Sequence, residues 1–270
     1  MFRNVFYLVF ASLLFSLAAC QSNSPSSEPA ATAAPEHKFT IFMAGDSTMS
    51  IKQLKDYPET GWGVPFAVFF DDSVRVENRA MNGRSTKTFI SEGRWQGIMD
   101  ELQAGDFVFI QFGHNDESIK KQERYTTPEQ FKNNLLRFIA DVTSKGAEPI
   151  LLSPITRRYF DDNGKIKLTH SHSPMVVEVA EQTNVAFIDM DPITRDYFTE
   201  MGDDLSTLRF MHIKPNTHPN YPFGVKDNTH TNHLGAREVA QLVLAELRKM
   251  EHPLVEHLRP TDPKHLKLKY

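Results

Sequence analysis

Four short polar segments of the sequence carry residue types that can perform acyl transfer. They are GDS at 45–47, NRAMNGRS at 78–85, FGHND at 112–116 and DNTH at 227–230. A serine hydroxyl becomes an effective nucleophile when a histidine removes its proton and an acidic group holds that histidine in the right tautomer. Ser47 offers the hydroxyl, and we expect Asp227 and His230, three residues apart on one loop, to supply the other two groups.

Acyl transfer also needs hydrogen-bond donors directed at the negative oxygen of the tetrahedral intermediate. The backbone N–H groups of Ser47 and Gly83 are two candidates, and glycine permits the close backbone approach that such a donor needs. The side-chain amide of Asn115 is a third. The sequence therefore predicts an oxyanion hole formed by Ser47, Gly83 and Asn115.

Each of these segments alone has an ordinary structural explanation. A GDS after a strand is typical of a turn, and both GHND and DNTH contain residues that cap helices. The joint pattern is stronger, because the segments occur at the positions where an alternating strand and helix fold builds its sites.

The elements that would hold these segments alternate along the chain. Strands are expected at 39–45, 74–80, 106–113, 148–155 and 185–190, and helices at 61–70, 94–102, 127–146, 175–183 and 232–250. Repeated units of this kind predict an α/β fold with a mainly parallel five-stranded sheet covered on both faces. Ligands of such sheets bind beyond the carboxyl ends of the strands. The first three polar segments follow strands, and the fourth precedes the last helix.

The composition limits the class of protein and the kinds of partner to expect. The chain has 270 residues, 40% of them hydrophobic and 24% charged, which fits a globular domain. A net charge of −4 gives no reason to expect a nucleic-acid partner. After the first twenty residues, no apolar run is long enough for a membrane-spanning helix.

The first twenty residues are typical of a signal peptide, with Arg3 ahead of an apolar stretch. Its last residues, LAAC at 17–20, resemble the bacterial lipobox, although an ordinary secretory signal that ends near a cysteine is an alternative. The resemblance implies lipidation of Cys20 and membrane anchoring, and Gln21 favours the outer membrane. Residues 21–36 are rich in Ser, Pro and Ala and predict a flexible linker, so that the globular domain covers 37–270.

The four segments together resemble the SGNH (GDSL-type) hydrolases, and within them the rhamnogalacturonan acetylesterases. The matching segments are GDST, PETGWG at 58–63, NGRSTKTFI at 82–90, QFGHND, SPITRRYFDDNGK at 153–165 and KDNTHTNHLGA at 226–236. The resemblance implies a three-layer α/β/α, flavodoxin-like fold. It also implies a Ser47–His230–Asp227 triad that removes acetyl groups from a pectic polysaccharide with no metal or other cofactor. His233 stands where relatives often carry another residue and is a second candidate for the base, and the tail 252–270 has no match.

Three further residues are candidates for binding substrate. Arg84 would face an anionic galacturonate, His114 would line the acetyl pocket, and Trp62 would stack on a sugar ring. The competing interpretations are a solvated loop arginine for Arg84 and a buried core residue for Trp62. Arg157 and Arg158 also belong to the family pattern, and at least one is expected to form a structural ion pair.

Other functions remain alternatives at this point. A metal-dependent phosphoesterase would need a histidine after the first strand, where this chain has GDST. A lipoprotein that binds glycan without cleaving it would not need every catalytic position filled, as they are here. The same mechanism acting on xylan, on another acetylated glycan or on a lipid ester stays open, because fold does not determine substrate.

Overall fold

The computed structural model describes residues 37–260 of the chain. The expected signal peptide 1–20 with Cys20, the linker 21–36 and the last ten residues of the tail lie outside the described residues. The boundaries expected for those segments therefore stay predictions.

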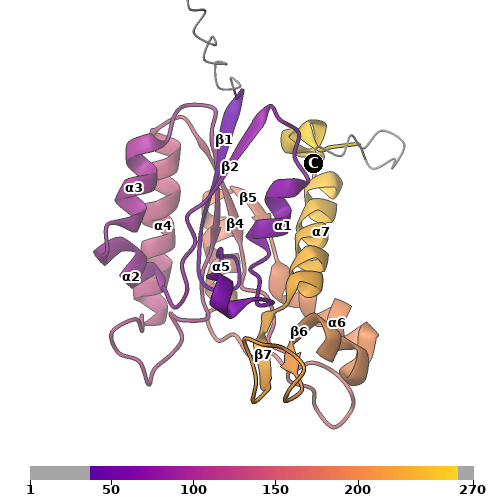
Figure 1. Ribbon diagram of the computed structural model, residues 1–270. Helices are drawn as coiled ribbons and strands as arrows, with labels where there is room; N and C mark the ends of the chain where they lie inside the picture. Colours follow the sequence, from indigo (N-terminus) through magenta and orange to yellow (C-terminus); the bar gives the residue numbers. More distant parts are fainter. Residues whose placement is uncertain (1–36, 261–270) are drawn as a thin grey trace, which may run out of the picture. The chain divides into compact units, whose positions relative to one another are not determined.

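A five-stranded parallel sheet forms the centre of the fold (Figure 1), as the sequence predicted. Its strands are β1 (Phe39–Gly45), β2 (Val74–Asn78), β3 (Phe107–Gln111), β4 (Glu148–Leu152) and β5 (Ala186–Ile188). Their order is β2-β1-β3-β4-β5, the order of flavodoxin-like folds. Gly45 at the end of β1 is paired in register with Gln111 at the end of β3, so the segments that follow these strands start side by side.

Helices cover both faces of this sheet, which gives the three-layer architecture. They are α1 (Gly63–Val68), α2 (Thr86–Ser91), α3 (Arg94–Glu101), α4 (Pro128–Ser144), α5 (Ser173–Thr183), α6 (Met190–Ser206) and α7 (His233–Lys249). Because successive strand side chains point to opposite faces, β1 contributes to two cores. Ile41 and Met43 lie in one core with α1, α6 and α7, whereas Phe42 and Ala44 lie in the other with α2 to α5.

Two helix starts near the site follow local sequence rules. Thr127 caps α4 in a reciprocal capping box with Gln130, and Pro128 occupies the first turn, where its missing N–H costs nothing. Asn232 caps α7 by accepting hydrogen bonds from the N–H groups of Leu234 and Gly235. The second cap also ends the strand that carries DNTH.

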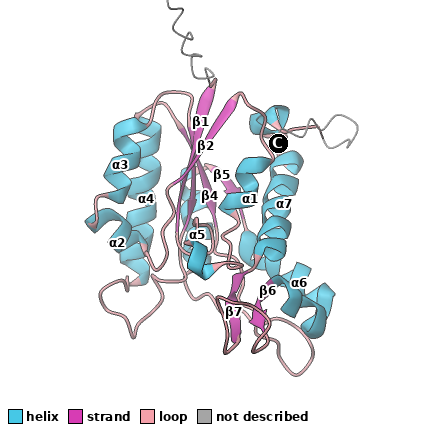
Figure 2. Ribbon diagram, in the orientation of Figure 1, coloured by secondary structure: helices cyan, strands magenta, loops and turns pink. Residues whose placement is uncertain are grey.

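That strand corrects one expectation, because Asp227 and His230 do not lie on a loop. They belong to β7 (Val225–Thr231), which pairs with β6 (Phe210–Ile213) in a separate antiparallel ribbon (Figure 2). Most β7 side chains are only half-buried, so its sequence lacks the alternation of apolar residues that usually signals a strand. Helices α2 and α6 were also not predicted; α2 has only six residues, and α6 is interrupted at Gly202, where φ is 80°.

The described part of the C-terminal tail packs against the domain. Residues Pro253–His257 form a 3₁₀ turn with Leu254 buried, and the N–H of Arg259 donates to the carbonyl of Phe69 just after α1. None of the helices within residues 37–260 is long and apolar enough to cross a membrane.

Candidate active site

Ser47 lies on a tight turn directly after β1, and Asp46 shapes that turn. The Asp46 side chain is fully buried, and its Oδ1 accepts hydrogen bonds from the backbone N–H of Thr48 at 2.9 Å and from the Thr48 hydroxyl at 2.8 Å. Ser47 remains partly exposed. The GDS segment therefore holds a serine hydroxyl outward at the carboxyl edge of the sheet.

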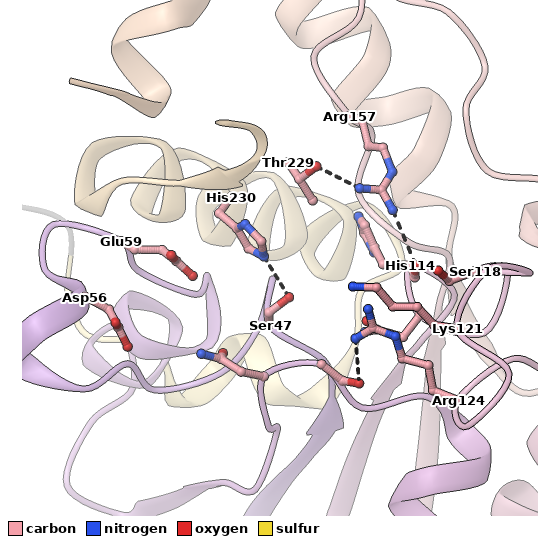
Figure 3. Close-up of a pocket in the computed structure, with 13 residues that line it drawn as sticks. Ser47, Asp56, Glu59, His114, Ser118, Lys121, Arg124, Arg157, Thr229 and His230 are labelled. Carbon is pink, nitrogen blue, oxygen red and sulfur yellow. Dashed lines mark hydrogen bonds between the residues drawn. The ribbon is translucent and has the colours of Figure 1, made fainter. Parts of the chain in front are cut away.

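His230 reaches this hydroxyl from the β6–β7 ribbon (Figure 3). Its Nε2 lies 2.9 Å from Ser47 Oγ, and its Nδ1 lies 2.6 Å from Asp227 Oδ2. The other carboxylate oxygen of Asp227 accepts from the backbone N–H groups of Thr229 and His230. Serine, histidine and aspartate thus form a continuous hydrogen-bonded chain, which is the geometry of a nucleophile, its base and the group that orients the base.

The Asp227 carboxylate is held in its ionised form. Its partial burial favours the neutral acid, but the hydrogen bond with His230, the charge interaction with that ring and the two backbone N–H donors outweigh burial and lower the pKa of Asp227 to about 2. The carboxylate is therefore charged at neutral pH, and it can stabilise the imidazolium that forms when His230 accepts a proton.

The ribbon that carries Asp227 and His230 is fixed to the rest of the domain on two sides. Thr60 and Thr231 exchange two hydrogen bonds of 2.9 Å each, one backbone and one from the Thr231 hydroxyl. On the other side, the backbone N–H of Arg158 donates to the carbonyl of Asn228 at 2.7 Å, and Arg158 forms an ion pair with Asp203. These contacts fix the position of His230 relative to Ser47.

Gly83 and Asn115 line the same cleft as Ser47. Gly83 has a φ of 76°, a backbone conformation that favours glycine. Asn115 Nδ2 donates one hydrogen bond to the carbonyl of Arg84 at 2.9 Å, and a side-chain amide has a second N–H for another acceptor. The expected oxyanion donors are therefore gathered around the nucleophile.

A buried lysine, Lys52, connects the turn that carries Ser47 with the loop that carries Gly83. The sequence did not single out this residue. Lys52 Nζ donates to the carbonyl of Ser47 and to Oδ1 of Asn82 at 2.7 Å, and it lies 2.8 Å from the carboxylate of Glu59. Its side chain is 5% exposed, and this burial lowers the pKa of Lys52 although Glu59 acts in the opposite direction. Lys52 follows Ser47 by five residues in a stretch without a recognisable pattern, so only the fold shows its position.

His114 also lines the cleft, but it is nearly buried. Its Nδ1 lies 3.3 Å from Asp46 Oδ2, and its ring packs edge-on against His170 with the ring centroids 4.4 Å apart. Burial is the main cause that lowers the pKa of His114 to about 4, so the ring is neutral at neutral pH. His114 thus belongs to the wall behind the nucleophile.

Three other residues that the sequence named as candidates for the site do not line the cleft. Trp62 is fully buried and donates its indole N–H to Gln111 Oε1 at 2.7 Å, so it has no face for a sugar, which corrects that expectation. Arg84 forms an ion pair of 3.0 Å with Glu92 and does not line the cleft. His233 is exposed on the first turn of α7 and stacks on Tyr57, away from Ser47.

The cleft has a volume of about 530 Å³ and is polar. Figure 3 shows Asp56 and Glu59 on one side of Ser47 and His230, and a group of cationic side chains on the other. These cationic residues are Lys121, Arg124 and Arg157. No motif in the sequence marks Lys121 or Arg124, because both stand in a charged stretch typical of a solvated loop. The cleft therefore places the Ser47 hydroxyl and His230 between an acidic side and a cationic side.

Comparisons with known proteins agree with this architecture. A sequence model of the GDSL-like lipase/acylhydrolase family matches residues 43–222. The rhamnogalacturonan acetylesterase RhgT of Bacillus subtilis is 39% identical over 219 residues, which cover 81% of this chain and 93% of that protein. The probable rhamnogalacturonan acetylesterase YesY of the same organism is 34% identical, covering 81% of this chain and 96% of YesY.

Among solved structures, the crystal structure of YxiM from Bacillus subtilis superposes with a TM-score of 0.70 at 26% identity. The match covers 81% of this chain and 58% of that one. These similarities confirm the family resemblance and the fold that the sequence motifs indicated.

Proposed function

Because the chain belongs to the GDSL-like lipase/acylhydrolase family, we propose that it is a serine esterase that removes acetyl groups from rhamnogalacturonan. Membership of this family indicates a carboxylic ester hydrolase. The similarity to two proteins named as acetylesterases of a polysaccharide supports a carbohydrate acetylesterase. The single observation that carries the mechanism is the 2.9 Å contact between Ser47 Oγ and His230 Nε2, with Asp227 on the other ring nitrogen.

In the first half of the proposed reaction, Ser47 Oγ attacks the carbonyl carbon of the acetyl ester. His230 Nε2 takes the hydroxyl proton as the new carbon–oxygen bond forms, and the Asp227 carboxylate stabilises the resulting imidazolium. The negative oxygen accepts hydrogen bonds from the N–H groups of Ser47 and Gly83 and from the Asn115 amide. His230 then gives its proton to the sugar oxygen as that oxygen leaves, which produces a free sugar hydroxyl and an acetyl-serine.

In the second half, water replaces the sugar. His230 takes a proton from a water molecule as its oxygen attacks the acetyl-serine, and the same donors hold the second negative oxygen. Collapse of this intermediate returns the proton to Ser47 Oγ and releases acetate. Throughout this sequence Asp227 stays ionised, which its pKa of about 2 favours.

The choice of a pectic substrate rests on two lines of support. The relatives of 39% and 34% identity are both named for rhamnogalacturonan. In addition, the cationic side of the cleft suits a polymer that contains uronic acid. A lipid substrate is less suited to this cleft, because all of the side chains that line it are polar or charged.

We further propose that the protein is exported and anchored to the outer membrane through lipid chains on Cys20. The support is the LAAC sequence at 17–20 and the residue that follows it. Membrane fractionation of cells that express the Cys20→Ala chain tests this, since the variant should leave the membrane fraction. A variant that stays with the membranes would argue against the lipid anchor.

Acetate release from acetylated rhamnogalacturonan by the purified protein tests the main proposal. The Ser47→Ala variant is the control for the mechanism, and acetylated xylan is the competing substrate. We expect release from the pectic polymer that is lost in the variant. Release from xylan alone would contradict the substrate, and undiminished release by Ser47→Ala would contradict the nucleophile.

A further inference from the structure

The cationic side of the cleft contains two side chains without an acidic partner. Lys121 and Arg124 both line the cleft, and neither forms an ion pair with any carboxylate among residues 37–260. Arg157, by contrast, is engaged: it donates to the Thr229 hydroxyl at 2.7 Å and lies 3.7 Å from Glu117. Two positive charges are therefore available at one end of the site.

Arg124 is held in place by the loop that carries Gly83. Its Nη1 donates to the carbonyl of Gly83 at 3.2 Å, while its Nε is buried and has no hydrogen-bond partner. The buried Nε is out of reach of a ligand, but Nη2 is not sealed off and forms no hydrogen bond within residues 37–260, so it can donate to a ligand oxygen. Because Gly83 also contributes to the proposed oxyanion hole, an anion on Arg124 would lie close to the acetyl group.

Lys121 and Arg124 lie on one ordered turn. The backbone N–H of Arg124 donates to the carbonyl of Lys121 at 3.0 Å, and the N–H of Thr126 donates to the carbonyl of Asp116 at 3.0 Å, which closes the loop. The segment that follows β3 contains Asn115 and continues into this turn, so it supplies a proposed oxyanion donor and both cations. This arrangement places the two positive charges on the same segment as a proposed oxyanion donor.

The opposite end of the cleft would repel an anion. Asp56 and Glu59 lie there (Figure 3), and only Glu59 is paired, with Lys52 at 2.8 Å. A substrate that carries a carboxylate therefore has one favourable orientation, with the anion toward Lys121 and Arg124. Charge complementarity of this kind selects orientation and rejects the reverse one.

We propose that Lys121 and Arg124 form a carboxylate subsite that binds a uronic acid residue at, or next to, the acetylated sugar. Arginine suits this role because its planar fork of N–H donors matches a carboxylate. The subsite deepens the proposed function, on which it rests for the identity of the sugar. It predicts that the enzyme distinguishes acidic from neutral acetylated polymers through these two residues.

Inhibition by an unacetylated oligogalacturonate tests the subsite, with p-nitrophenyl acetate as the reporter ester. The acidic oligomer should inhibit the unmodified protein competitively, and a neutral oligogalactose of equal length should inhibit far less. Lys121→Met should raise the inhibition constant at least about tenfold, as expected for loss of one charged hydrogen bond. Arg124→Lys, which keeps the charge but loses the fork, should also raise it.

Lys120→Met is the matched control, because Lys120 is the exposed neighbour of Lys121 and does not line the cleft. It should leave the inhibition constant within about twofold. Added salt should weaken inhibition more in the unmodified protein than in Lys121→Met, since it screens the charge that the variant lacks. Equal inhibition by both oligomers, or an unchanged constant in Lys121→Met and Arg124→Lys, would overturn the subsite. A failure of the proposed substrate shows separately, as absence of acetate release from acetylated rhamnogalacturonan.

Discussion

Two histidine–aspartate pairs lie beside the same serine, and they differ in their surroundings. In the pair on the ribbon, His230 and Asp227 are 2.6 Å apart with side chains 26% and 30% exposed. In the pair behind the nucleophile, His114 and Asp46 are 3.3 Å apart with side chains 3% and 0% exposed. The residue types are identical, so the surroundings decide what each pair can do.

The difference shows what a catalytic base requires. The second ring nitrogen of His230 contacts Ser47 Oγ, and partial exposure allows the ring to exchange protons. Neither ring nitrogen of His114 forms a hydrogen bond, although Nδ1 approaches Asp46, and burial lowers the pKa of His114 to about 4. Asp46 in turn is occupied by Thr48 in shaping the turn. One pair is therefore suited to proton transfer and the other to holding the nucleophile in place.

The same substitution in both histidines is the strongest test of this comparison. We expect His230→Asn to lower kcat by about 10⁶-fold, because loss of the base disables the nucleophile. His114→Asn should lower kcat by less than about tenfold, because an amide nitrogen can take the place of Nδ1 beside Asp46. Stopped-flow or steady-state rates with p-nitrophenyl acetate measure both.

Thermal unfolding of the two variants is the control, since a loss of activity is informative only when the fold remains. Comparable losses of kcat in the two folded variants would break the distinction between the pairs. It would give His114 a direct part in the reaction.

The two aspartates provide a second test with a smaller expected effect. Asp227→Asn should reduce kcat by about 10⁴-fold, because an amide favours the wrong tautomer of His230 and cannot stabilise its charged form. Asp46→Asn keeps an oxygen that can accept from Thr48, so we expect kcat to fall by less than about tenfold. Parallel rates at pH 8 measure the two effects, and a larger loss in Asp46→Asn than in Asp227→Asn would contradict the assignment.

Much of the fold followed from the sequence because its central strands are buried. The residues Val108, Phe109 and Ile110 are fully buried in β3, so the segment is apolar throughout and is recognisable as an interior parallel strand. The β6–β7 ribbon was missed for the opposite reason, since most residues of β7 are polar and only half-buried. A strand can be recognised from its sequence only where at least one of its faces is fully buried and therefore apolar.

The site divides in the same way. Ser47, Gly83 and Asn115 follow sheet strands, so the predicted topology alone brings them to one edge. Lys52 and Arg124 act through tertiary contacts with Ser47, Asn82 and Gly83 that no local pattern encodes. Trp62 shows the converse, because the sequence left sugar binding and core packing open for this residue, and only the fold shows that it is fully buried.

The last and smallest test concerns folding stability, where the buried pair should show its own signature. His114 stays neutral in the folded protein down to about pH 4, whereas an unfolded histidine gains a proton near pH 6.5. Between these values the unfolded state binds more protons, so the free energy of unfolding falls as the pH is lowered, by about 3 kcal/mol for this residue. Asp116 acts oppositely, because burial raises its pKa to about 7, but it is common to both proteins and cancels from the difference.

Urea unfolding from pH 7 to 4.5 should therefore show a flatter loss of stability in His114→Asn than in the unmodified protein. A difference between the two proteins that stays constant over this range would mean that His114 is not held neutral, and the contrast between the two pairs would lose its electrostatic basis.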